Sequence, residues 1–161
     1  MQNLRQTQCS NLFILGFNIN PNKFKIELKS HMKILNLIIK QVFFDQIIEG
    51  TKKQEFREIK PTTAKKYIQI DENNYFVEDE NGNCVPLHYD AIQFYVGYNK
   101  DRDSALVEVT GAYTQFIVDE NDEPLKYKLD NGDDFFVEEI VYNLGKVLEK
   151  KTKKQTNSQT L

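Results

Sequence analysis

The sequence predicts an α+β domain built on a curled, barrel-like sheet of about six strands, with short helices only in its N-terminal half. Short runs with two-residue alternation recur along the chain, and turn signals such as Asn81-Gly82 separate them. The aromatic residues are Phe and Tyr without Trp, and both favour strands. The chain has 161 residues, 40% of them hydrophobic and 28% charged, which fits one globular domain.

The first elements are a buried strand, a short helix and a second strand. Residues 34–39 form an apolar run typical of a strand. Residues 41–49 are expected to be helical, because Phe43, Phe44, Ile47 and Ile48 recur at three- and four-residue spacing. Gly50 stands where a left-handed C-cap glycine belongs, and the second strand follows at about 53–59.

The rest of the domain is predicted to be mainly strands and hairpins. Two hairpins resemble each other around Asp79-Glu80-Asn81 and Asp119-Glu120-Asn121, which indicates two similar turns and no repeat architecture. In order, we expect a second short helix at 61–68, a hairpin pairing 75–77 with 84–87, a strand at 91–98, a β-rich run at 105–118 with a bend near Gly111, a hairpin pairing 126–129 with 135–137, and a last strand at 141–149.

The two ends of the chain are expected to lie outside this domain. Residues 1–31 form an N-terminal extension of uncertain status, either an extra strand or ordered arm, or a segment preceding a true start at Met32. Residues 32–149 form the domain, and 150–161 form a basic tail without apolar residues until its last position, expected to be disordered. The apolar run at 12–17 is too short to span a bilayer, so no membrane association is predicted.

Charge and cysteine content narrow the class of partner. The formal net charge of −3 argues against non-specific coating of nucleic acid. Residues 50–67 nevertheless carry six basic and two acidic residues, a net +4, whereas 71–80 carry no basic residue. This segregation favours a local basic patch on an acidic body. The two cysteines, Cys9 and Cys84, have no metal-site spacing, so we expect no metal or cofactor and a cytoplasmic location.

The stretch after the first helix concentrates the candidate site residues. Lys53, Glu55 and Arg57 alternate with Gln54 and Phe56, which places three charged side chains on one face of a strand. A cluster of this kind is typical of a site for an anionic or polar ligand. The planar fork of an arginine suits phosphate or carboxylate, although an ion pair that only stabilises the fold remains an alternative.

The motif Gly50-x-Lys52-x-x-Glu55-x-Arg57 after a short apolar helix resembles the G-x-K-x-x-E-x-R signature of ASCH domains. These belong to the PUA-like superfamily of small β-barrels associated with RNA. The resemblance covers about residues 32–149 and includes family-like strands near 92–100, 106–109 and 141–148. It implies a PUA-like barrel that binds RNA or a modified nucleotide in a cleft beside the motif.

The family also implies an enzymatic alternative, because one compact branch resembles an amidohydrolase that removes the acetyl group from N4-acetylcytidine. Its catalytic lysine falls on Lys52, and Glu108 is the candidate glutamate by position. Its threonine falls on Glu55, so the sequence departs from the branch there. A lysine acts as nucleophile or base only when its pKa falls far below about 10.4.

The candidate residues therefore carry alternative roles. The predicted ligand-binding set is Gly50, Lys52, Lys53, Glu55, Arg57 and Tyr95, and the predicted catalytic set is Lys52, Glu55 and Glu108. Tyr95 and Tyr98 are both candidates for stacking on a base, with core packing or a place at the barrel rim as the alternative. A third possibility is a non-catalytic interaction module. The sequence does not fix the base preference or the oligomeric state.

Overall fold

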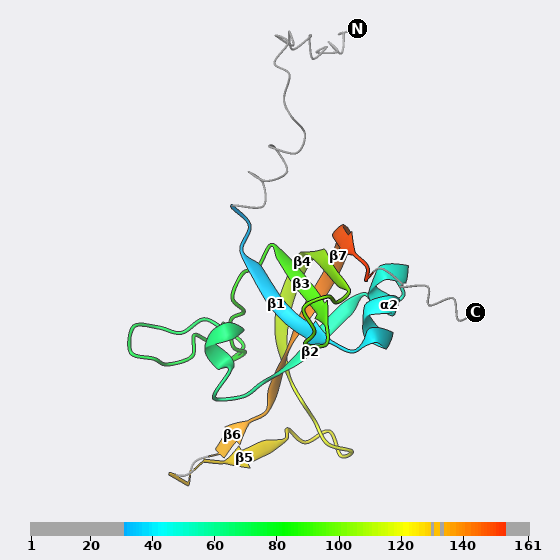
Figure 1. Cartoon of the computed structure of the whole chain (residues 1–161). Helices are drawn as coiled ribbons and strands as arrows, with labels where there is room; N and C mark the ends of the chain where they lie inside the picture. Colours follow the sequence, from blue (N-terminus) through cyan, green and yellow to red (C-terminus); the bar gives the residue numbers. More distant parts are fainter. Residues whose placement is uncertain (1–30, 130, 133, 154–161) are drawn as a thin grey trace, which may run out of the picture. The chain divides into compact units, whose positions relative to one another are not determined.

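The computed structural model describes residues 31–129, 131–132 and 134–153, and Figure 1 shows the arrangement of their elements. The chain divides into two units, Met1–His31 and Met32–Leu161, and every helix and strand named below belongs to the second unit. The expectations for residues 1–30 and for 154–161 lie outside the described residues.

Five strands form one mixed sheet. Its order is β1 (Ile34–Ile39), β3 (Ala91–Val96), β4 (Ser104–Phe116), β7 (Glu138–Lys151) and β2 (Gln54–Ile59). β1 is parallel to β3, and the other neighbouring pairs are antiparallel. A separate two-stranded sheet pairs β5 (Lys126–Lys128) with β6 (Asp134–Phe136).

This architecture agrees with the predicted α+β class, but the sheet is not closed into a barrel. β1 and β2 are the two edges of the five-stranded sheet, with no strand ladder between them. The single α-helix of the described residues, α2 (Gln41–Glu49), connects these two edge strands in sequence (Figure 1). The two edge strands, β1 and β2, are therefore joined in the chain only by α2 and the short turn that begins the Gly50–Arg57 motif.

The core forms where alternation directs side chains to the inner face of the sheet. In β1 the odd-numbered residues Leu35, Leu37 and Ile39 are buried, and the even-numbered ones point away. The helix α2 contributes Phe44 and Ile47 to the same core. Full burial of such side chains stabilises the fold by about 1.5–3 kcal/mol each.

The corner between α2 and β2 confirms the predicted glycine cap. Gly50 has φ of 74°, in the left-handed region, and its N–H donates to the Ile47 carbonyl at 3.0 Å. The N–H groups of Thr51 and Lys52 both donate to the Gln46 carbonyl, at 2.9 and 3.1 Å. These bonds satisfy two of the last carbonyls of the helix and fix Lys52 two residues before β2.

Three expectations from the sequence need correction. The second helix predicted at 61–68 is one 3-10 turn, η1 (Ala64–Lys66), because the chain enters an isolated bridge with Pro86 at Ile68, directly after this turn. The hairpin predicted at 75–87 is held by isolated bridges, such as Glu78 with Cys84, and not by continuous strands. β7 extends to Lys151, two residues into the predicted tail, because β4 offers partners as far as Ser104.

The bend in β4 and the similarity of two hairpin turns are confirmed. β4 shifts register between Val109 and Gly111, as expected for a bulge. The Asp79 and Asp119 carboxylates each accept N–H bonds from the residues two and four positions further on. Asp71 makes the same pair of bonds. These backbone N–H donors lower the pKa of Asp79 and of Asp119.

Candidate functional site

A cleft of about 740 Å³ lies where β1 and β3 end, next to α2 and β2. This volume lies in the range of small-molecule sites. The cleft contains three of the predicted site residues, Lys52, Glu55 and Arg57. The remaining lining residues are Ile38, Ile39, Lys40, Gln41, Phe43, Phe56, Val96, Gly97 and Tyr98.

Glu55 is the charged centre of this cleft. Its side chain is almost fully buried, and the residue is only 5% exposed. One carboxylate oxygen lies 2.7 Å from Nη2 of Arg57, and the other lies 3.4 Å from Nζ of Lys52. A buried carboxylate requires such partners, because removing it from water is costly unless it is paired.

Arg57 connects the two edge strands of the sheet. Its Nη2 atom also donates to the Ile38 carbonyl of β1 at 3.1 Å. The Nε atom of the same guanidinium is buried and has no hydrogen-bond partner. The alternation of β2 places Arg57 on the same face as Glu55, so one ion pair orients the arginine across the gap between β2 and β1.

Lys52 lies between two aromatic rings. Its Nζ atom is 5.6 Å from the ring centre of Phe43 and 5.4 Å from that of Phe56. Both rings are 42% exposed, so they offer faces to solvent as well as to the ammonium group. The ammonium group of Lys52 therefore contacts one carboxylate and two ring faces.

The structure does not place Tyr95 in the cleft. Its ring lies 4.2 Å from the guanidinium of Arg102, which is itself fixed by a 2.7 Å bond to the Gly97 carbonyl. Alternation along β3 explains this position, because the buried Phe94 faces the core and Tyr95 faces the other side. The tyrosine that lines the cleft is Tyr98, which is 85% exposed.

Glu108 also lies outside the cleft lining. One carboxylate oxygen accepts the backbone N–H of Lys146 at 3.2 Å, in the neighbouring strand β7. Its side chain covers Gly145, where a Cβ atom would lie only 2.5 Å from the carboxylate. Glu108 therefore supports the irregular part of the β4–β7 pairing and does not approach Lys52 through the cleft.

Gly50 and Lys53 lie in the turn between α2 and β2, and neither lines the cleft. Gly50 shapes the turn that precedes the motif strand. The Lys53 carbonyl accepts the N–H of Leu144 at 2.8 Å, which extends the β2–β7 pairing, while its side chain is exposed. Of the six predicted ligand-binding residues, three line the cleft and three lie beside it.

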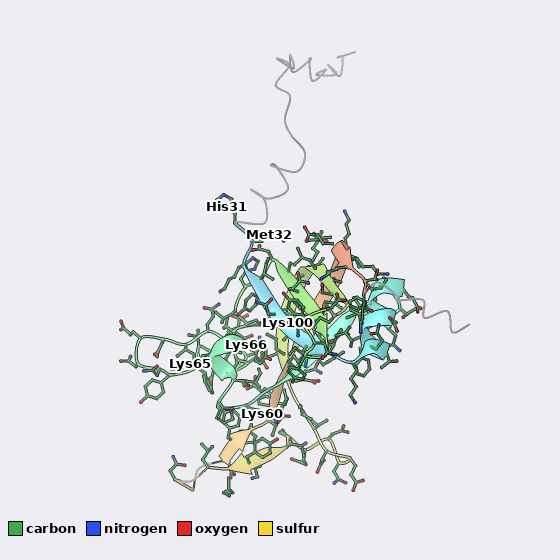
Figure 2. The ribbon with its side chains drawn as sticks, viewed as in Figure 1. His31, Met32, Lys60, Lys65, Lys66 and Lys100 are labelled. Carbon is green, nitrogen blue, oxygen red and sulfur yellow. The ribbon has the colours of Figure 1, made fainter. Side chains whose placement is uncertain are left out.

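Sequence reasoning missed the contact between Lys66 and β1. Lys66 is the last residue of η1 (Figure 2), and its Nζ atom donates to the Asn36 carbonyl of β1 at 3.1 Å. Partial burial and the nearby Arg57 guanidinium lower the pKa of Lys66. The buried Tyr67 beside it has a raised pKa, mainly through burial. The only sequence signal was that Lys66 belongs to the basic stretch 50–67.

The described residues provide neither a metal cluster nor a long apolar helix. Within 31–153, apart from residues 130 and 133, no group of three or more His, Cys, Asp or Glu side chains could hold a metal ion. No helix in the described part of the chain has the length and apolar character needed to cross a membrane.

Comparisons with known proteins found no match to this chain among family models, curated proteins or solved structures. What the cleft binds is therefore inferred from its geometry and from the spacing of its motif.

Proposed function

We propose that this chain is an ASCH-like, PUA-type domain that binds RNA or a modified nucleotide in the cleft beside Gly50-x-Lys52-x-x-Glu55-x-Arg57. One observation carries the proposal. The buried Glu55 carboxylate holds Lys52 and Arg57 in a cleft of about 740 Å³ that also presents exposed aromatic rings. Cations beside stacking surfaces are what an unpaired nucleotide requires.

The cleft offers a distinct partner to each part of a nucleotide. Phe43, Phe56 and Tyr98 are exposed aromatic side chains, and stacking on such rings is worth about 1–3 kcal/mol per base. Lys52 and Arg57 supply cationic donors for phosphate or base carbonyl oxygens. Glu55 orients both donors, so the site is organised before the ligand arrives.

The geometry gives less support to the amidohydrolase alternative. A nucleophilic lysine needs a free amine, whereas Nζ of Lys52 is paired with the Glu55 carboxylate and lies over two phenyl rings. Glu108 lies against β7 and not in the cleft. A binding role needs no change in the contacts of Lys52 with Glu55 and the two rings. The interaction-module alternative leaves the paired cations in the cleft without a purpose.

The test is a binding screen of nucleosides, N4-acetylcytidine and short RNAs by isothermal titration calorimetry. Lys52→Ala and Tyr98→Ala should each weaken binding about tenfold or more, since each removes a contact worth about 1–3 kcal/mol. Tyr75→Ala is the matched control, because Tyr75 is also highly exposed, at 72%, and lies outside the cleft lining. The proposal would be refuted if the wild type bound none of these ligands, or if both cleft variants bound them with the wild-type affinity. Turnover of N4-acetylcytidine that disappears in Lys52→Ala would establish the enzyme instead.

A further inference from the structure

Two cationic side chains occupy the open edge of β1. Nζ of Lys66 donates to the Asn36 carbonyl, and Nη2 of Arg57 donates to the Ile38 carbonyl, each at 3.1 Å. The two carbonyls are two residues apart, which is about 6.6 Å along a strand. Lys40 follows the end of β1 and lines the cleft. A row of positive charge therefore runs along β1 into the cleft.

The cations in this row differ in how far they are neutralised. Arg57 is paired with Glu55, whereas among the described residues no carboxylate pairs with the Lys66 ammonium. Lys66 donates its hydrogen bond to a neutral carbonyl. A hydrogen bond from an ammonium group to a carboxylate or phosphate would be stronger. Partial burial, followed by the charge of Arg57, lowers the pKa of Lys66, so the two cations are close enough to repel each other. An anion placed between them would relieve this repulsion.

The same contacts argue against a peptide added to the sheet at this edge. A peptide strand would need the carbonyls of Asn36 and Ile38 as hydrogen-bond acceptors, and both are already occupied by side chains. A polyanion would instead bind the Arg57 and Lys66 side chains that donate to these carbonyls. Polynucleotides combine regularly spaced phosphates with bases that stack on aromatic rings such as Phe56 and Tyr98.

We propose that the ligand site extends from the cleft along β1, so that the partner is a single-stranded RNA segment with one base in the cleft and the adjoining phosphate between Arg57 and Lys66. This inference rests on the proposed function of the cleft. It adds a residue outside the motif, Lys66, and a direction for the bound strand. Lys66 contacts the phosphate backbone and not the base, so it contributes affinity without base preference.

The experiment compares the four nucleosides with the four homopolymeric tetraribonucleotides, over a range of salt concentrations. Lys66→Gln should weaken tetranucleotide binding about five- to tenfold and leave nucleoside binding unchanged. The dependence of log K on log salt should become shallower by about 0.7, the loss of one phosphate contact on a single strand. Lys66→Arg should retain the wild-type slope. Lys128→Gln, an equal charge change on the exposed strand β5, is the control and should have neither effect.

The outcomes separate this inference from the proposed function of the cleft. If Lys66→Gln leaves both tetranucleotide affinity and salt slope unchanged, the extended track is refuted while cleft binding stands. If the variant weakens nucleosides and tetranucleotides equally, Lys66 supports the cleft structure and the track is also refuted. If the wild type binds neither kind of probe, the function of the cleft fails and the track fails with it.

Discussion

Replacing Glu55 by glutamine should destabilise the domain more than any other single loss of charge in the cleft. The substitution keeps the shape of the side chain and removes its negative charge. Lys52 and Arg57 then remain near each other with no carboxylate between them. The guanidinium keeps its bond to Ile38, but its buried Nε atom is still without a partner.

The magnitude follows from the burial of the three partners. Breaking a fully buried ion pair costs about 3–5 kcal/mol, because the remaining charge is left uncompensated. Here Glu55 is buried, but the side chains of Lys52 and Arg57 are 19% and 28% exposed, so water screens part of the loss. We therefore expect the free energy of unfolding to fall by about 2–3 kcal/mol.

Urea denaturation measures this change directly. With a slope of about 1–3 kcal/mol per molar urea, the midpoint should fall by about 1 M or more at an unchanged slope. The control is Asp101→Asn, which removes an ion pair of 3.9 Å to Lys151 whose side chains are both about two-thirds exposed. That variant should change stability by about 0.5 kcal/mol or less. A loss of this small size in Glu55→Gln would show that the carboxylate does not organise the cleft.

Three further predictions concern single side chains away from the ion pair. Gly50→Ala should cost about 1 kcal/mol in urea denaturation, because φ of 74° is unfavourable for alanine, and Gly50→Asn should cost less. Burial, followed by the neighbouring Glu138, raises the pKa of the Cys84 thiol from 9.0 to about 12. The stability that the neutral thiol contributes is complete below pH 9 and is lost as the pH rises towards 12, so the urea midpoint should fall more steeply there than in Cys84→Ala. Gly145→Ala should cost about 1–3 kcal/mol by crowding Glu108, and adding Glu108→Ala should recover part of it; an additive double variant would contradict the contact.

Local patterns predicted the elements of the fold, because their causes lie within a few residues. The spacing of Phe44 and Ile47 and the glycine after them were enough to place α2 and its end. Closure of the sheet was different. Whether β1 and β2 hydrogen-bond to each other depends on how the whole five-stranded sheet bends, and in the structure the Arg57 side chain donates to the Ile38 carbonyl across that gap. The predicted barrel is therefore an open sheet with bridged edges.

The sequence predicted which site residues share one face of β2, but not which residues of other elements lie beside them. Alternation along β2 placed Glu55 and Arg57 on one face, and the structure joins them at 2.7 Å. The choice between Tyr95 and Tyr98 depended on which face of β3 meets the cleft, which the alternation of β3 alone does not decide. Lys66 reaches β1 from thirty residues away, and no local pattern encodes such a contact.

The bonds that Arg57 and Lys66 make to β1 link stability to recognition. The edge carbonyls of Asn36 and Ile38 accept hydrogen bonds from these two side chains, so the cations also serve the fold. A phosphate bound between them would be held by groups already fixed in place, with little side-chain entropy left to lose. The open edge of the sheet is thus the feature that a closed barrel would remove, and it is where Arg57 and Lys66 contact β1.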